Sequence, residues 1–172
     1  MTADADAQVA RAQADDGRSP DELIAAYRDG ARLLRNAVAD MDADALRARP
    51  EPGRMSALEV VCHVADCDQF LADRMKRTIG TEKPLLLGAN ASSYLEALHY
   101  HDRDVELDLE LVDVTRRQMA DDLARLPAEA WARTAVHSET GLVTLRQLLL
   151  HAVRHLEHHV ETVHEKRLLL GV

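Results

Sequence analysis

The sequence predicts an all-α protein, an antiparallel four-helix bundle, from three observations. Apolar residues make up 47% and charged residues 30% of the chain, which is the balance of a globular domain. Aromatic residues are only 3%, while Ala, Leu, Arg and Asp are plentiful, and this composition favours helices over a β-sandwich. Four segments begin at a helix-capping pattern and continue with apolar residues at helical spacing. The 172 residues suit one domain.

The domain is expected to occupy residues 19–172. Residues 1–18 carry Ala, Asp and Gln without an apolar stripe, so we predict a solvated or frayed acidic tail. The first helix should begin at Ser19, which can cap it, with Pro20 in the first turn and Glu22 completing a capping box. One buried face is then predicted, formed by Leu23, Ile24, Tyr27, Ala31, Leu34, Val38 and Met41.

The second helix is predicted over residues 57–78. Pro50 and Gly53 interrupt regular structure before it, and Ser56 with Glu59 forms a second capping box. Its inward stripe should consist of Val60, Val61, Val64, Cys67 and Leu71.

The third helix is predicted over residues 93–126, with a capping box at Ser93 and Glu96 and with a polar stretch at 99–104 that allows a kink. A loop that holds Trp131, His137 and Gly141 follows Pro127. The fourth helix should run from the capping box of Thr144 and Gln147 to Leu170, where Gly171 terminates it. The helices should be connected in alternating directions or with one crossover.

Composition and charge also exclude several classes of function. A formal charge of −9 argues against nucleic-acid binding, which needs a basic surface. No segment approaches the ~18 consecutive apolar residues of a membrane span, and the N-terminus lacks the basic and apolar regions of a signal peptide. Cys62 and Cys67 are five residues apart in one predicted helix and are poor disulfide partners. We expect a soluble, cytoplasmic protein.

Histidines interrupt the apolar face of the fourth helix. His155 and His159 fall on the same arc as its inward leucines and valines, whereas His151, His158 and His164 lie on its flanks or outer face. Residues at i and i+4 lie one turn apart, so His155 and His159 can bind one metal ion. Of the five histidines in the fourth helix, two are therefore predicted to be metal ligands.

A third ligand is offered by His63, at the edge of the inward stripe of the second helix. Neutral imidazole suits zinc, nickel, copper or iron, and three nitrogen ligands leave a coordination position for water or substrate. The alternative is a plain bundle in which these histidines form hydrogen bonds inside the core and bind no metal.

Two segments resemble the DinB/YfiT-like superfamily. The stretch SALEVVCHVADCDQFLADRMKRTI, followed by EKPLL, is similar to its first metal-binding helix, and HSETGLVTLRQLLLHAVRHLEHHVETV is similar to its last helix and the preceding loop. The resemblance implies an antiparallel four-helix bundle with an open metal pocket at one end, zinc or nickel as the cation, and a homodimer. It assigns the three metal ligands to His63, His155 and His159.

The family includes thiol S-transferases, mycothiol-dependent isomerases and proteins described as metal-dependent hydrolases. We therefore expect an enzyme for a small-molecule substrate, whose metal activates either water or a low-molecular-weight thiol such as mycothiol or bacillithiol. The alternative is a non-catalytic, metal-stabilised bundle that binds a small molecule or serves in a stress response.

Two carboxylates of the second helix are candidates for a catalytic role. Asp66 aligns with an acidic position of the family and could orient a ligand or act as a base, or could be a solvent-facing ion-pair partner. Asp68 falls within the apolar arc, so it needs an imidazole or an arginine as partner. Cys67 is either an extra ligand or packing. The resemblance places His137 near the metal end, where it could contact substrate.

Overall fold

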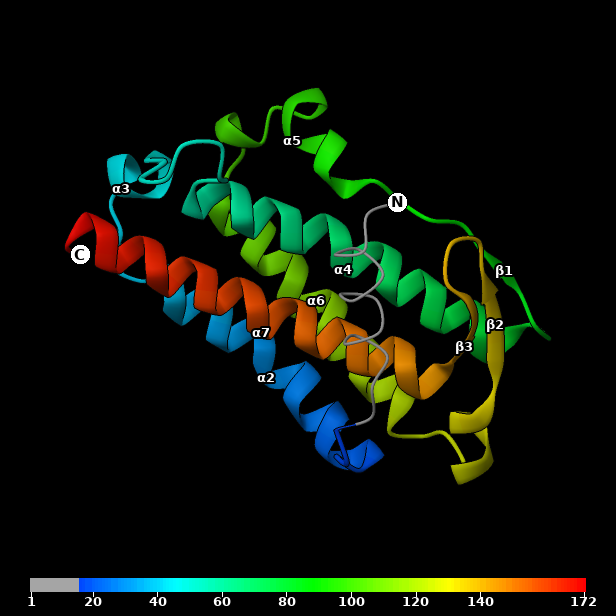
Figure 1. Cartoon of the computed structure of the whole chain (residues 1–172). Coiled ribbons are helices and arrows are strands. Elements are labelled where there is room, and N and C mark those ends of the chain that lie inside the picture. The colour runs from blue at the N-terminus through cyan, green and yellow to red at the C-terminus, as the bar shows by residue number, and fades with distance from the viewer. Residues whose placement is uncertain (1–15) are drawn as a thin grey trace.

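Four long helices pack as a bundle in the computed structural model, which describes residues 16–172 (Figure 1). They are α2 (Pro20–Val38), α4 (Ala57–Gly80), α6 (Val105–Leu123) and α7 (Leu145–Leu170). Their apolar stripes face inward and form two adjoining core clusters along the bundle. The predicted all-α, four-helix class is confirmed.

Three of the four predicted helix starts are confirmed by their caps. Ser19, Ser56 and Thr144 each accept a hydrogen bond from the backbone N–H three residues later, and the Glu or Gln at that position accepts one in return. At the other end of α7, Gly171 adopts the left-handed conformation, with φ of 74°, that ends many helices. Helix α4 extends two residues beyond its predicted end.

The helices are connected with one crossover. In Figure 1, α2 and α7 run towards the end of the bundle that is marked C, and α4 and α6 run in the opposite direction. Hydrogen bonds agree, because Lys76 near the end of α4 contacts Gln118 near the end of α6, and Arg167 near the end of α7 contacts the carbonyl of Ala37. The pairs α4–α7 and α2–α6 are antiparallel, whereas α4–α6 and α2–α7 are parallel.

The crossover replaces the first part of the predicted third helix. This segment contains two 3-10 turns, η1 (Ala91–Ser93) and η2 (Tyr100–Asp102), and the short helix α5 (Tyr94–Ala97). The predicted helix is interrupted at His99, whose φ of 50° lies in the left-handed region. Helix α6 begins later, with Asp104 as its capping residue. The predicted capping box at Ser93 is wrong, because its side chain makes no capping hydrogen bond.

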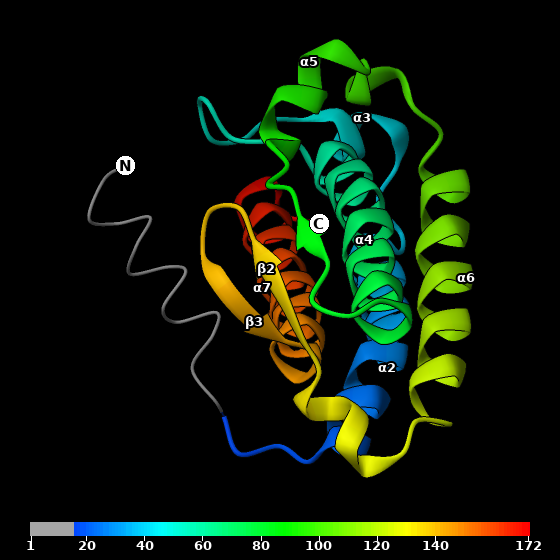
Figure 2. The ribbon, with the colours of Figure 1, turned by 90° about the vertical axis from the view of Figure 1, so that its right-hand side faces the viewer.

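A small sheet covers one end of the bundle (Figure 2). Strand β1 (Leu85–Leu86) pairs in parallel with β2 (Thr134–His137), which pairs antiparallel with β3 (Gly141–Thr144). The 3-10 helix η3 (Ala128–Ala132) precedes β2. Arg133 donates hydrogen bonds to the carbonyls of Thr78 and Thr81, and its own carbonyl accepts from Leu145. The sheet thus ties the end of α4 to the start of α7.

A fully buried arginine joins the four helices. Arg116 of α6 donates two hydrogen bonds to Asp68 of α4, at 2.5 and 2.8 Å, and donates to the carbonyls of Tyr27 in α2 and Ala152 in α7. Its guanidinium also lies over the ring of Tyr27. The space is tight, since a Cβ at Gly30 would come within 2.5 Å of the guanidinium.

The remaining described elements close the ends of the domain. A short helix, α3 (Ala43–Arg47), is capped by Asp42 and packs near the start of α4. Most of the predicted tail, residues 1–15, lies outside the described residues; of the rest, Arg18 pairs with Asp16 and with Glu157 of α7. Over residues 16–172, no helix is long and apolar enough to cross a membrane.

Candidate metal centre

Three imidazole rings from two helices meet between α4 and α7. His63 comes from α4, and His155 and His159 come from successive turns of α7. The Nε2 atoms of His63 and His155 are 3.2 Å apart. The ring centres are separated by 5.2 Å for His63–His155, 4.8 Å for His63–His159 and 4.5 Å for His155–His159. The structure therefore brings together the three residues that the sequence predicted as ligands.

These distances fit a shared cation. With metal–nitrogen bonds of about 2.05 Å and a tetrahedral angle, two ligand nitrogens are roughly 3.3 Å apart and the centres of their rings roughly 5 Å apart. The observed separations of 3.2 Å between nitrogens and of 4.5–5.2 Å between ring centres lie close to those values. The nitrogens of His63 and His155 are therefore spaced as ligands of one ion would be, and the ring of His159 lies beside both, although the donor atoms that lie within 4.8 Å of one another are those of His63, His155 and Cys67.

Burial keeps the three rings in the protonation state that binds metal. Loss of water lowers the pKa of His63, and it lowers that of His155 well below the usual value. For His159, which is 8% exposed, burial and then the neighbouring His63 lower the pKa to about 3. The imidazoles are therefore neutral near pH 7, and a neutral ring nitrogen has the lone pair that a metal needs.

Two ring nitrogens of the cluster are buried without a partner. Among the described residues, Nδ1 of His155 and Nδ1 of His159 receive and donate no hydrogen bond. A buried polar atom without a partner costs free energy, and such atoms in native proteins often await water, an ion or a ligand. Among the described residues the three imidazoles therefore do not form a closed hydrogen-bond network, and two ring nitrogens remain open to water or another bound group.

Cys67 also lies in the cluster, one turn after His63. Its Sγ atom is 3.6 Å from Nε2 of His63, and donor atoms of His63, Cys67 and His155 all lie within 4.8 Å of one another. Both cysteines are free thiols. Cys62 points elsewhere, towards the carbonyl of Tyr100 at 3.5 Å, and packs with Leu58.

The other histidines of α7 differ in their surroundings. His158 and His164 are exposed, as predicted. His151 is half-buried, with its ring centre 6.2 Å from that of His155, so it lies on the flank of α7, beside the cluster. His137 in β2 lies close enough to His151 to lower its pKa, after burial and Arg74. The sheet therefore places His137 on this side of the bundle.

Asp66 is held away from the imidazoles by two other side chains. It is 8% exposed, accepts a 2.5 Å hydrogen bond from the hydroxyl of Tyr100, and pairs with Arg103 at 3.1 Å. Arg103 in turn pairs with Asp108. Asp66 is thus a buried ion-pair partner and not the solvent-facing one that the sequence analysis considered. Its charge still opposes the effect of burial on the pKa of His63.

Asp68 is fully buried and has Arg116 as its partner. Burial raises the pKa of Asp68, and the Arg116 guanidinium lowers it. Of the two partners that the sequence analysis named for this carboxylate, the structure shows the arginine. Over residues 16–172, no hydrogen bond joins Asp66 or Asp68 to the three imidazoles.

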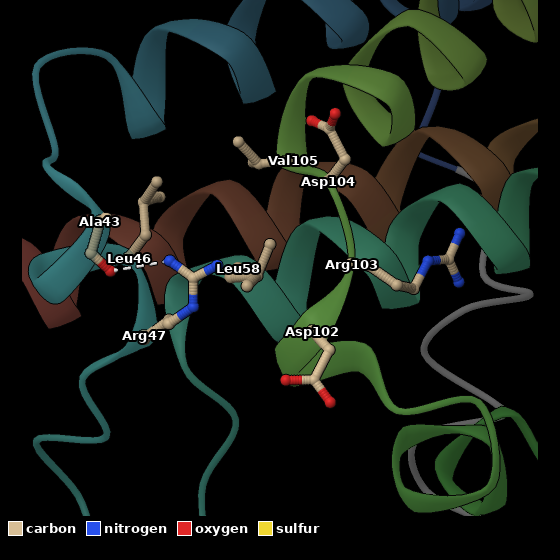
Figure 3. A pocket seen from close by; sticks show the side chains of 8 residues that line it. All are labelled: Ala43, Leu46, Arg47, Leu58, Asp102, Arg103, Asp104 and Val105. Carbon is tan, nitrogen blue, oxygen red and sulfur yellow. Dashed lines mark hydrogen bonds between the residues drawn. The ribbon is translucent and has the colours of Figure 1, made fainter.

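A cavity of about 420 Å³ opens beside the start of α4 (Figure 3). It lies between α3, the start of α4 and the junction that leads into α6. Its lining residues are Ala43, Leu46, Arg47, Leu58, Asp102, Arg103, Asp104 and Val105. It includes none of the clustered histidines, but Arg103 lines it and also pairs with Asp66.

Comparison with known proteins places the chain in a family. The family model of the DinB superfamily matches residues 26–163. The chain belongs to the DinB superfamily. The match spans α4 and most of α7, and so includes all three clustered histidines of this DinB-superfamily protein.

Two relatives agree with this assignment. A protein from Oceanobacillus iheyensis, which bears the provisional name of metal-dependent hydrolase, is 25% identical over 139 residues, or 81% of this chain and 80% of the relative. The structure of YfiT from Bacillus subtilis is described as a probable metal-dependent hydrolase with an unusual four-helix bundle topology. It matches with a TM-score of 0.85 and 22% identity, over 92% of this chain and 93% of YfiT. The YfiT match shows a shared fold.

Proposed function

We propose that this DinB-superfamily protein is a metal-dependent hydrolase for a small-molecule substrate, with a divalent cation held by His63, His155 and His159. The observation that carries the proposal is the meeting of three neutral imidazoles from α4 and α7, with nitrogens of His63 and His155 at a separation that fits one ion and the ring of His159 beside both. The provisional name of the Oceanobacillus iheyensis relative supports the same reaction class. Zinc and nickel are the cations that we expect, because both accept imidazole nitrogen.

The protein's own residues supply the binding site and its rigidity. A bound divalent cation would act as a Lewis acid and lower the pKa of a water that enters its coordination sphere. Arg116 fixes α4 against α7 through Asp68 and the carbonyl of Ala152, and so sets the separation of the two ligand helices. We assign Asp68 a positioning role, since both of its oxygens accept from Arg116.

Asp66 has a different place in the proposal. Its hydrogen bonds to Tyr100 and Arg103 hold its carboxylate one turn from His63, where its negative charge favours binding of a cation. We propose that Asp66 contributes this charge, and that it is not the base predicted from the sequence, because Tyr100 and Arg103 already occupy its oxygens.

Two alternatives use the same residues. Transfer to a low-molecular-weight thiol would use the cation to activate a thiol in place of water, as the family resemblance also implies. A non-catalytic metal-binding bundle would have a closed coordination sphere, and the position of Cys67 is the observation that favours this alternative.

The test is metal analysis of protein purified without a histidine tag, followed by assays of ester and amide hydrolysis. We expect one zinc or nickel per chain, loss of metal and hydrolysis in His155→Ala, and retention of both in the control His158→Ala, whose ring is exposed. A requirement for added mycothiol or bacillithiol would favour thiol transfer. Metal without hydrolysis or transfer would favour the binding bundle, and absence of metal would refute all three.

A further inference from the structure

We propose that Cys67 is a fourth ligand of the cation, so that α4 and α7 each contribute two donors one turn apart. The inference rests on the proposed metal centre. Helix α7 contributes His155 and His159, and helix α4 contributes His63 and Cys67, and both pairs have the i, i+4 spacing that places side chains on one helix face.

The distances support direct coordination by sulfur. With zinc bonds of about 2.3 Å to sulfur and about 2.05 Å to nitrogen at a tetrahedral angle, the sulfur and nitrogen of two ligands are roughly 3.6 Å apart. The Sγ atom of Cys67 is 3.6 Å from Nε2 of His63. The same nitrogen is 3.2 Å from Nε2 of His155, the separation that two imidazole ligands require. Two of the three separations among His63, Cys67 and His155 therefore match those of ligands of one ion, and the third, between Cys67 and His155, is within 4.8 Å.

The surroundings of the two cysteines distinguish them. Cys67 is 8% exposed and lies against His63, whereas Cys62 is fully buried in a separate apolar cluster with Leu58 and Tyr100. The Cys62 thiol donates to the carbonyl of Tyr100 and has no imidazole nitrogen among its hydrogen-bond partners in the described residues. The Sγ atom of Cys67 instead lies 3.6 Å from Nε2 of His63, the nitrogen that also approaches His155.

Sulfur ligation has consequences for the centre. Thiolate is a soft ligand that favours zinc over harder divalent cations. A site with three nitrogens and one sulfur is four-coordinate, so its resting state would be closed to substrate. Entry of an external ligand would require Cys67 to leave or the coordination number to rise to five. Burial, with Asp68 and Asp66, raises the pKa of Cys67 to about 12, so that binding of the cation must displace the thiol proton.

Cobalt(II) titration of the full chain tests the inference without an activity assay. A cobalt–thiolate bond gives a charge-transfer absorption in the near ultraviolet, and cobalt bound by nitrogen alone gives only the weaker visible bands. We expect the charge-transfer band in the wild type and in Cys62→Ser, and its absence in Cys67→Ser. Cys67→Ala serves as a second variant in case the serine hydroxyl disturbs packing.

The affinity for zinc gives a second measurement. Loss of a mere hydrogen-bonding partner of a ligand typically weakens metal binding by about 10- to 100-fold, and we expect Cys67→Ser to exceed that range. Cobalt bound in stoichiometric amount without a charge-transfer band would overturn the role of Cys67 and leave the three-histidine centre intact. A band that survives Cys67→Ser or disappears in Cys62→Ser would also overturn it. Failure of all variants to bind cobalt or zinc would refute the metal centre itself.

Discussion

Arg116→Met removes the guanidinium that links α6 to the other three long helices, and it leaves the Asp68 carboxylate buried without its partner. Both side chains of this ion pair are fully buried. Removing one partner of such a pair typically costs about 3–5 kcal/mol, because the other charge remains out of water. For a domain of this size, 1 kcal/mol lowers the melting temperature by about 2–4 °C. We therefore expect the melting temperature to fall by roughly 6–20 °C.

The assay is thermal and urea unfolding of the metal-free protein, monitored by circular dichroism. The double variant Arg116→Met/Asp68→Leu should be more stable than either single variant, since replacing both charges by apolar groups is often neutral or stabilising. The matched control is Arg117→Met, which removes the exposed i, i+4 ion pair with Asp113 and should change the free energy of unfolding by less than about 0.5 kcal/mol.

Two results would refute the reasoning about this pair. The first is a single variant within about 1 kcal/mol of the wild type in free energy of unfolding, which would mean that the charge is not isolated from water. The second is a double variant whose loss equals the sum of the single losses, because coupled partners should not be additive. An Asp68→Asn variant of unchanged stability that binds metal but hydrolyses nothing would restore the catalytic role predicted for Asp68.

The metal centre gives three further expectations. Metal analysis should show that His155→Ala and His159→Ala each lose stoichiometric metal while His158→Ala keeps it, because the first two rings contact His63 whereas His158 is exposed; equal loss in all three would mean that the inward face of α7 is wrongly assigned. Because the pKa of His159 is about 3 when folded and near 6.5 when unfolded, the unfolded chain binds more protons between these values. Urea titrations of the metal-free protein should therefore show stability falling as pH falls from about 6.5 to about 3, by up to about 1.4 kcal/mol per pH unit for this residue, and His159→Gln should flatten that slope. Protein whose metal has been removed by a chelator should keep a helical circular dichroism spectrum. Metal at a hundredfold excess over Kd should then raise the free energy of unfolding by about 3 kcal/mol. A random-coil spectrum after chelation would mean that the metal is required for folding.

Helix ends with a capping residue could be predicted from the sequence. Ser19, Ser56 and Thr144 each begin a helix because local hydrogen bonds decide the conformation there. The same pattern at Ser93 failed, since the turn at His99 and the burial of Tyr100 against Leu58 depend on tertiary contacts that a local pattern does not contain.

The sheet was missed for a similar reason. Strands of two and four residues are too short to show an alternating pattern. In addition, almost 50 residues of chain separate β1 from β2, the strand with which it pairs. The only local signal was Gly141, whose φ of 76° suits the turn between β2 and β3.

The candidate site was predictable in part. The i, i+4 spacing of His155 and His159 and the edge position of His63 could be read locally, as could the proximity of Cys67 to His63 along the helix. The partner of Asp68 could not be identified, because Arg116 is 48 residues away and nothing in its own segment marks it as buried. Residue patterns locate ligands on one helix face, but they do not identify which distant side chains complete an ion pair.

The two halves of the metal centre are synthesised at different times. His63 and Cys67 are made with α4, whereas His155 follows 92 residues later, near the end of the chain. At about 5–20 residues per second, roughly 5–18 s separate the two events during translation. Until then α4 offers only two donors, so the proposed centre can form only after α7 has been made. A cell that makes this protein faster than it supplies the cation would accumulate folded, metal-free molecules that can be loaded later.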